Sequence, residues 1–92
     1  MSLHRKAARR DHTERAIIDA LQAAGATVTA ISAPGVPDLL VATPDGETLL
    51  MECKARRGTL TDDQRRFHER WLGRIVIARN IEDALRAIGR MD

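Results

Sequence analysis

A Pro-Asp-Gly turn between two short apolar runs constrains the fold of this chain more than any other feature of the sequence. The apolar runs 39–42 and 48–51 are separated by Thr43-Pro44-Asp45-Gly46-Glu47. Proline fixes the backbone at the first corner of a turn, and Asp and Gly tolerate the conformations that complete it. The two runs therefore predict a β-hairpin, and a turn centred on Asp45 places Asp38 directly opposite Glu52.

Three helices are predicted from capping residues and from apolar side chains at helical spacing. Their caps and stops are Asp11 with Glu14 and Gly25 for the first, Thr61 with Gln64 and Gly73 for the second, and Asn80 for the third. Their apolar stripes are Ile17, Ile18, Leu21 and Ala24, then Phe67 and Trp71, then Ile81, Ala84, Leu85 and Ile88. We expect each stripe, including both aromatic rings of the second helix, to face the core.

Two β-branched segments outside the hairpin predict further strands. Residues 26–31 read ATVTAI and precede the hairpin, and residues 74–78 contain IVIA and lie between the second and third helices. The order αβββαβα is typical of one mixed α/β domain with a central sheet flanked by helices. A length of 92 residues, 43% of them hydrophobic, supports one compact core and excludes a multidomain enzyme.

The basic residues are unevenly distributed along the chain. Residues 1–10 contain four basic residues and no acid, which leaves 11 basic against 13 acidic residues in the rest of the chain. We interpret 1–10 as a basic arm on a mildly acidic domain, 11–92, and expect it to contact the phosphates of a polyanion. The alternative is a solubilising, disordered terminus.

No apolar run approaches the roughly 20 residues that a membrane helix needs, and the first residues lack the apolar stretch of a signal peptide. We therefore expect a cytoplasmic protein with no membrane partner. The single cysteine, Cys53, excludes an internal disulfide, so self-association is expected to support the small core.

Two acids and a lysine meet in the predicted hairpin. Directly opposed residues of an antiparallel pair have Cβ atoms about 4.5–5.5 Å apart, so Asp38 and Glu52 repel each other unless a cation compensates. Mg²⁺ prefers such oxygen ligands, and strand alternation places Lys54 on the same face as Glu52. Carboxylates, a divalent cation and an ammonium group fit phosphodiester hydrolysis. Alternatively, Asp38 is a turn residue after Pro37, and Glu52 and Lys54 form a weak surface pair.

The motif Pro37-Asp38, followed by Glu52-Cys53-Lys54, resembles the signature of PD-(D/E)XK nucleases. The stretches GVPDLLV, ECKARRGTLTDDQRRFHERW and IVIARNIEDAL look like the stand-alone VRR-NUC domains of this superfamily, which are similar in fold to archaeal-type Holliday junction resolvases. The resemblance covers nearly the whole chain from Asp11 onward. It implies a restriction-endonuclease-like αβββαβα core with a mixed sheet, and a single nuclease domain over 11–92.

The resemblance also implies roles for individual residues. Asp38, Glu52 and the backbone carbonyl of Cys53 are expected to bind Mg²⁺ or Mn²⁺, and Lys54 is expected to be the catalytic lysine, with the Cys53 side chain incidental. Glu14 matches an acid that family members place near the metal, and Gln64 matches a glutamine that lines the site. Each has an alternative role in a capping box, Glu14 with Asp11 and Gln64 with Thr61. Related nucleases have a tyrosine where this chain has His68, which is therefore interpreted as a packing residue.

Basic residues near the motif are candidates for DNA binding. They are Arg56 and Arg57 in the loop after Lys54, Arg65, Arg66 and Arg70 on the second helix, and Arg5, Lys6, Arg9 and Arg10 in the N-terminal arm. Arginines next to a scissile phosphate can grip the flanking phosphates, although solvated loop arginines are the alternative.

The leading hypothesis is a metal-dependent DNA endonuclease that cuts as a homodimer and is selective for branched or four-way junction DNA. Resemblance to the family implies products with 5′-phosphate and 3′-hydroxyl ends, and small stand-alone nucleases of this kind are typical of phages and bacteria. The alternative is a non-catalytic DNA-binding module or accessory subunit with the same fold. No phosphate-binding glycine loop is present in the sequence, so no nucleotide cofactor is expected.

Overall fold

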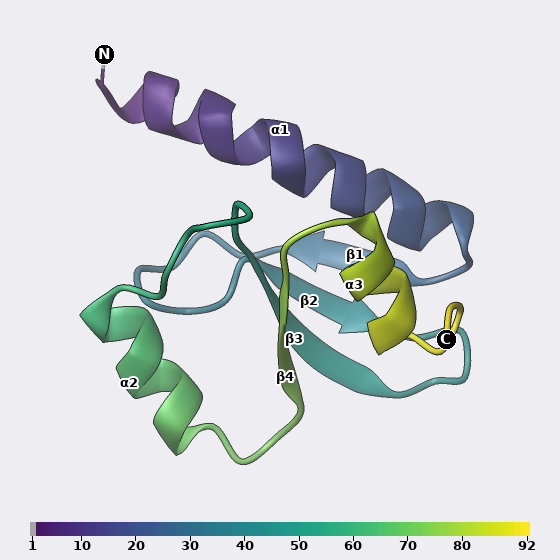
Figure 1. Cartoon of the computed structure of the whole chain (residues 1–92). Helices are drawn as coiled ribbons and strands as arrows, with labels where there is room; N and C mark the ends of the chain where they lie inside the picture. Colours follow the sequence, from purple (N-terminus) through teal and green to yellow (C-terminus); the bar gives the residue numbers. More distant parts are fainter. Residues whose placement is uncertain (1) are drawn as a thin grey trace.

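A computed structural model describes the backbone of residues 2–92 and the side chains of residues 12–92. The elements follow the order αβββαβα, as the sequence predicts (Figure 1). They are α1 (Ser2–Ala23), β1 (Thr27–Ala30), β2 (Leu39–Ala42), β3 (Thr48–Cys53), α2 (Asp62–Arg70), β4 (Ile75–Ala78) and α3 (Ile81–Ala87).

The sheet is mixed and has four strands in the order β1-β2-β3-β4. The first three strands pair antiparallel, and β4 pairs parallel to β3. Leu39 lies opposite Met51 and Leu40 opposite Leu50, which confirms the predicted hairpin register. Continued by one residue, this register sets Asp38 opposite Glu52.

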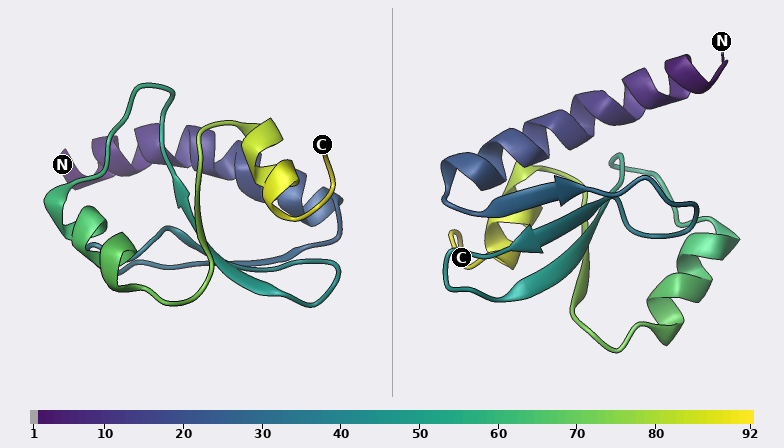
Figure 2. Two further views of the ribbon diagram at one scale, coloured as in Figure 1. Left: turned by 60° about the horizontal axis from the view of Figure 1, so that its bottom comes forward. Right: turned by 180° about the vertical axis from the view of Figure 1, so that it is seen from behind.

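The core lies between the sheet and the pair α1 and α3, whereas α2 stands apart from both helices (Figure 2). Ile17 and Leu21 of α1 pack on the sheet because the helix presents them one turn apart on one face. The sheet contributes Leu39, Val41, Leu49 and Met51, and α3 contributes Ala84 and Ile88. Ile81, predicted as part of the α3 stripe, is instead 38% exposed because it lies at the first turn of that helix.

The predicted start of the first helix is wrong. The helix begins at Ser2 and passes through Asp11, so Asp11 is not an N-cap. Residues 2–10 contain Leu, Ala, Lys and Arg and no Gly or Pro, so helix propensity carries the helix through this segment. The side chains of the predicted basic arm lie outside the described residues. The predicted end is confirmed, because Gly25 has a φ of 96° and follows the last turn.

The prediction for the second helix is right at its start and wrong at its end. Thr61 and Gln64 form the expected capping box, but the helix ends at Arg70 and Trp71 is its C-cap. None of the nine residues of α2, all of which the structure describes, is buried, and Trp71 is 42% exposed. The ring of Phe67 stacks on Trp71 at 5.3 Å between centroids. The two rings therefore cover each other beside the sheet and do not enter the core.

Candidate active site

Asp38 is fixed at the start of β2 by the chain on both sides of it. Pro37 before it is fully buried, and the Asp38 carbonyl accepts a 2.7 Å hydrogen bond from the Ile31 N–H. The side chain is 3% exposed, and its Oδ2 accepts a 2.8 Å hydrogen bond from the Cys53 N–H on β3. Asp38 is thus a buried, oriented carboxylate, and its backbone forms a bend directly before β2. Its interpretation as a turn residue describes the backbone but does not account for the buried side chain.

Glu52 is the most deeply buried acid among the described residues, at 1% exposure. Its Oε2 lies 4.0 Å from the Lys54 Nζ, whose side chain is 16% exposed, and 3.4 Å from the Gln64 Nε2. Gln64 also accepts the Thr61 N–H through its Oε1 at 2.9 Å, so it forms the capping box and contacts Glu52 at the same time. The surface-pair interpretation of Glu52 and Lys54 is therefore wrong, because both side chains are largely withdrawn from solvent.

Glu14 contributes a second carboxylate beside that of Asp38. It lies on α1, is half-buried, and its carboxylate lies within 4.8 Å of both the Asp38 carboxylate and the Cys53 Sγ. The capping-box alternative for Glu14 fails because the helix continues past Asp11. The Cys53 thiol, predicted to be incidental, is part of this cluster.

The chemistry of these donors fits a hard divalent cation. Burying a carboxylate costs several kcal/mol unless charge or hydrogen bonds compensate. Here the buried Asp38 carboxylate lies within 4.8 Å of the Glu14 carboxylate, and the buried Glu52 carboxylate lies beside Lys54 at the same end of β3. Carboxylate and carbonyl oxygens are the ligands of Mg²⁺ and Mn²⁺, whereas a thiol favours softer ions. The acids and the Cys53 backbone carbonyl therefore fit the predicted ion better than the Cys53 side chain does.

His68 lies next to this cluster on α2, one helical turn after Gln64. Its Nε2 is buried and has no hydrogen-bond partner among residues 12–92. Burial lowers the pKa of His68 below its ordinary value of 6.5, and the nearby Lys54 ammonium lowers it further. The imidazole is therefore neutral at pH 7 and borders the lysine.

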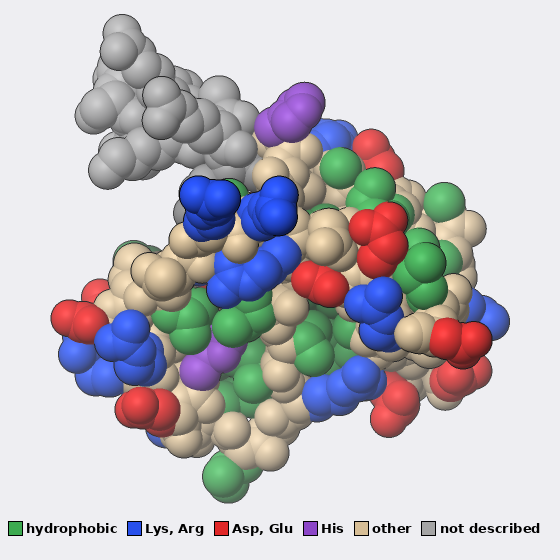
Figure 3. Space-filling model, in the orientation of Figure 1, with side chains coloured by type: hydrophobic (Ala, Val, Ile, Leu, Met, Phe, Trp, Pro, Cys, Tyr) green, Lys and Arg blue, Asp and Glu red, His purple; other side chains and the backbone are tan. Residues whose placement is uncertain are grey.

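The predicted DNA-binding residues fall into distinct environments. Arg56 and Arg57 are exposed in the loop after Lys54. Arg65 and Arg66 are exposed on α2 and pair with Asp62 and Asp63, which reduces their free positive charge. Several Lys and Arg side chains gather in the upper part of the face seen in Figure 3, next to a hydrophobic area. Arg5, Lys6, Arg9 and Arg10 lie outside the residues whose side chains are described.

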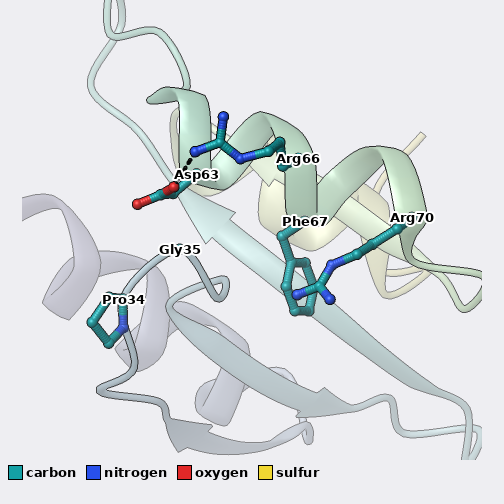
Figure 4. Close-up of a pocket in the computed structure, with 6 residues that line it drawn as sticks. All are labelled: Pro34, Gly35, Asp63, Arg66, Phe67 and Arg70. Atoms are coloured by element: carbon teal, nitrogen blue, oxygen red, sulfur yellow. Dashed lines mark hydrogen bonds and ion pairs between the residues drawn. The ribbon is translucent and has the colours of Figure 1, made fainter.

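A cavity of about 470 Å³ lies between α2 and the loop that leads to Asp38 (Figure 4). Its lining residues are Pro34, Gly35, Asp63, Arg66, Phe67 and Arg70. The Arg70 guanidinium lies over the Phe67 ring at 5.1 Å, and Arg66 turns toward Asp63. Gly35 has a φ of 78°, and a Cβ there would lie 3.2 Å from the Asp63 Cβ, so glycine lets the loop approach the helix.

Arg79, which no sequence pattern singled out, directly follows β4 and contacts the loop after Lys54. Its Nη1 donates to the carbonyls of Ala55, Arg56 and Gly58, all in the loop after Lys54. The contact is predictable once the two strands are known to be parallel, because neighbouring parallel strands end at the same edge of a sheet. Once 48–53 and 75–78 are paired in parallel, the residues that follow them, Lys54 and Arg79, become neighbours.

The chain is a mixed α/β domain with a four-stranded sheet, helices packed on it and two buried acids, Asp38 and Glu52, at one end of β3. Among solved structures, one described as a VRR_NUC domain matches this chain with a TM-score of 0.73 and 23% identity. The match covers 87% of this chain and 94% of that one. The chain thus has the VRR-NUC fold, as its motifs predict.

Sequence comparison alone adds no further relative. No protein-family model matches the chain, and no curated protein matches it. Among the described residues, no helix is both long enough and apolar enough to cross a membrane.

Proposed function

We propose that the chain is a metal-dependent DNA endonuclease. The observation that carries this proposal is that two groups of side chains lie at the same end of β3. Glu14, Asp38 and Cys53 form one group, and Glu52, Lys54 and Gln64 form the other. The two strand acids are almost fully buried, which is costly in a domain this small. An arrangement of this cost is expected where the acids and the lysine act on a ligand.

The residues divide into a cation-binding set and a phosphate-binding set. Asp38, Glu52, Glu14 and the Cys53 carbonyl would hold Mg²⁺ or Mn²⁺. When bound, the cation polarises the scissile phosphate and lowers the pKa of a water. Asp38 is held in one orientation by the Cys53 N–H, and Gln64 holds Glu52, so neither carboxylate has to reorganise on binding.

Lys54 supplies the positive charge that the reaction needs at the phosphate. Its ammonium lies beside Glu52 and can donate to a phosphate oxygen as negative charge develops there. Water attacks phosphorus while the bond to the 3′ oxygen breaks, which leaves 5′-phosphate and 3′-hydroxyl ends. Arg56 and Arg57 extend from the adjacent loop and are suited to the flanking phosphates.

A homodimer acting on branched DNA is the finer form of this proposal. Exposed apolar side chains support it: Leu40 is 41% exposed, Trp71 42%, Leu72 100% and Ile77 36%. By strand alternation, Leu40 and Ile77 share the sheet face of Glu52, opposite the core. A second copy that covers this face would bring two acidic sites onto one DNA, and two sites suit the paired cuts of a four-way junction.

The test is cleavage of labelled four-way junction, flap, single-stranded and linear duplex DNA with Mg²⁺, Mn²⁺ or EDTA. We expect metal-dependent cutting by the native protein, and loss of cutting in Asp38→Asn and Lys54→Ala. Asp45→Asn and Arg74→Ala are matched controls, because these residues are exposed and lie at the hairpin turn and the start of β4. DNA that is bound but not cut under any condition would contradict the proposal and identify a non-catalytic DNA-binding module.

A further inference from the structure

Arg79 makes an unusual set of contacts for a residue that follows an edge strand. Its Nη1 lies 2.9 Å from the Ala55 oxygen, 3.3 Å from the Arg56 oxygen and 2.6 Å from the Gly58 oxygen. All three acceptors are backbone carbonyls of one short loop. Hydrogen bonds from a charged donor are stronger than those between neutral groups, so the guanidinium fixes the path of this loop.

The backbone of Arg79 is itself held rigidly. Its N–H donates to the Asp83 Oδ2 at 2.9 Å, and Asp83 is held in turn by the cap of α3, where its own N–H donates to the Asn80 Oδ1 at 2.7 Å. The backbone of Arg79 is therefore anchored to the junction of β4 and α3. Because its backbone is fixed, Arg79 restricts the positions that loop 55–58 can adopt.

The loop that Arg79 holds lies against Lys54. The Lys54 N–H donates to the Ala78 carbonyl at 3.0 Å, and the Gly58 N–H closes a turn onto the Ala55 carbonyl at 3.0 Å. The position that a Cβ would occupy on Gly58 lies 3.6 Å from the Lys54 Cδ. The backbone at Gly58 thus packs on the lysine stem and limits the directions in which the ammonium can point.

From these contacts we infer that Arg79 is a positioning residue that acts through loop 55–58 to aim the Lys54 ammonium at the substrate phosphate. The inference rests on the proposed nuclease function for its catalytic consequence, but the structural link to Lys54 can be tested without it. Arginine suits this role because it stays charged at all physiological pH values and presents several donors in a fixed plane. It takes no part in binding the cation or the phosphate.

The kinetic test compares Arg79→Ala, Arg79→Lys and Arg74→Ala on the DNA that the native protein cuts best. Arg74 is the matched control, because it also donates to a backbone carbonyl, that of Ala87 at 2.6 Å, but lies at the other end of β4. Misplacing a catalytic group by about 1 Å costs about 100-fold in rate, so we expect kcat of Arg79→Ala to fall by about that factor with KM nearly unchanged. Arg79→Lys should retain an intermediate kcat, and free guanidinium should partly restore Arg79→Ala.

A second readout does not depend on cleavage. The chain has two lysines, Lys6 and Lys54, so ¹³Cε-lysine labelling gives two side-chain signals, and Lys54→Arg identifies the one from Lys54. We expect Arg79→Ala to shift the Lys54 signal toward that of a solvated lysine, guanidinium to reverse the shift, and Arg74→Ala to leave the signal unchanged. If Arg79→Ala does not fold, Arg79→Lys and Arg79→Gln provide the comparison.

The outcomes separate the inference from the function on which it rests. An unchanged Lys54 signal in folded Arg79 variants overturns the positioning role, whatever the activity. An Arg79→Ala protein with the same kcat as Arg74→Ala also overturns it. If the native protein cuts no DNA but the Lys54 signal responds to Arg79, the proposed nuclease function fails and the structural coupling stands.

Discussion

The substitution Asp38→Asn should stabilise the metal-free protein while it removes the cation site. Asn has nearly the same shape as Asp and keeps a side-chain oxygen that can accept the Cys53 N–H, so the change removes mainly charge. The Glu14 and Asp38 carboxylates approach within 4.8 Å. Two negative charges at that distance repel by about 3 kcal/mol at the effective dielectric of a protein site.

Some of this gain is lost because the charged hydrogen bond from Cys53 becomes a neutral one, which costs about 1 kcal/mol. The net increase in the free energy of unfolding is therefore about 2 kcal/mol. For a domain of this size, that corresponds to a rise in Tm of about 8–16 °C. The native protein should instead gain stability from metal, by about 2.7 kcal/mol at a free ion concentration of 100 times the dissociation constant.

The assay is thermal unfolding followed by circular dichroism, in EDTA and across a series of Mn²⁺ concentrations. Asp38→Asn should have the higher Tm in EDTA and little response to Mn²⁺, and the native protein and Asp45→Asn should respond fully. The reasoning is refuted if Asp38→Asn lowers Tm in EDTA, because repulsion would then not dominate the site. It is equally refuted if Mn²⁺ raises the Tm of Asp38→Asn as much as that of the native protein.

Three further predictions address other parts of the molecule. Below pH 6.5 the unfolded chain takes up a proton that folded His68 resists, so the free energy of unfolding should fall as the pH drops from 6.5 toward the lowered pKa of His68. His68→Gln should weaken this dependence, and a pH series of Tm values from about pH 8 to about pH 5 checks it. Leu72→Glu, at a fully exposed leucine, should leave Tm nearly unchanged and shift sedimentation from dimer to monomer; a native protein that sediments as a monomer would contradict the dimer. Gly35→Ala should lower the free energy of unfolding by about 1 kcal/mol or more, because φ is 78° and the new Cβ would crowd Asp63. Gly46→Ala is the control: Gly46 also has a positive φ but open space around it, so this change measures the cost of the positive φ alone.

The hairpin and its register were predictable because the information is local. The turn residues fix where the chain reverses, and a slip by one residue would turn Leu39, Val41, Leu49 and Met51 away from the core. That register carries Asp38 to Glu52, so the centre of the candidate site followed from the turn alone. The capping boxes were also local, and the one at Thr61 is present.

The features that the sequence analysis missed depend on contacts between distant segments. The pattern of α2 is amphipathic, but amphipathicity does not say whether a surface lies opposite the apolar side chains. Among residues 2–92, no other helix covers the sheet on that side, so Phe67 and Trp71 stack on each other and Trp71 stays half-exposed. The start of α1 was misplaced because a capping signal at Asp11 does not set the start of a helix when the residues before it also favour a helix.

The mixed topology explains why the candidate site lies where it does. The antiparallel strand β2 starts where β3 ends, so Asp38 meets Glu52, and the parallel strand β4 ends beside β3, so Arg79 meets the loop after Lys54. If β4 ran antiparallel to β3, its start and not its end would lie beside Cys53. The loop after Lys54 would then lose its contact with Arg79. The acids, the lysine and the arginine thus depend on both neighbours of β3. Glu52 faces away from the core by strand alternation, whereas Cys53, beside the Glu14 and Asp38 carboxylates, packs against the core. Substitutions at Glu52 and Lys54 should therefore change the proposed metal binding and catalysis without unfolding the domain, and substitutions such as Leu39→Ala should cost about 2–5 kcal/mol in stability.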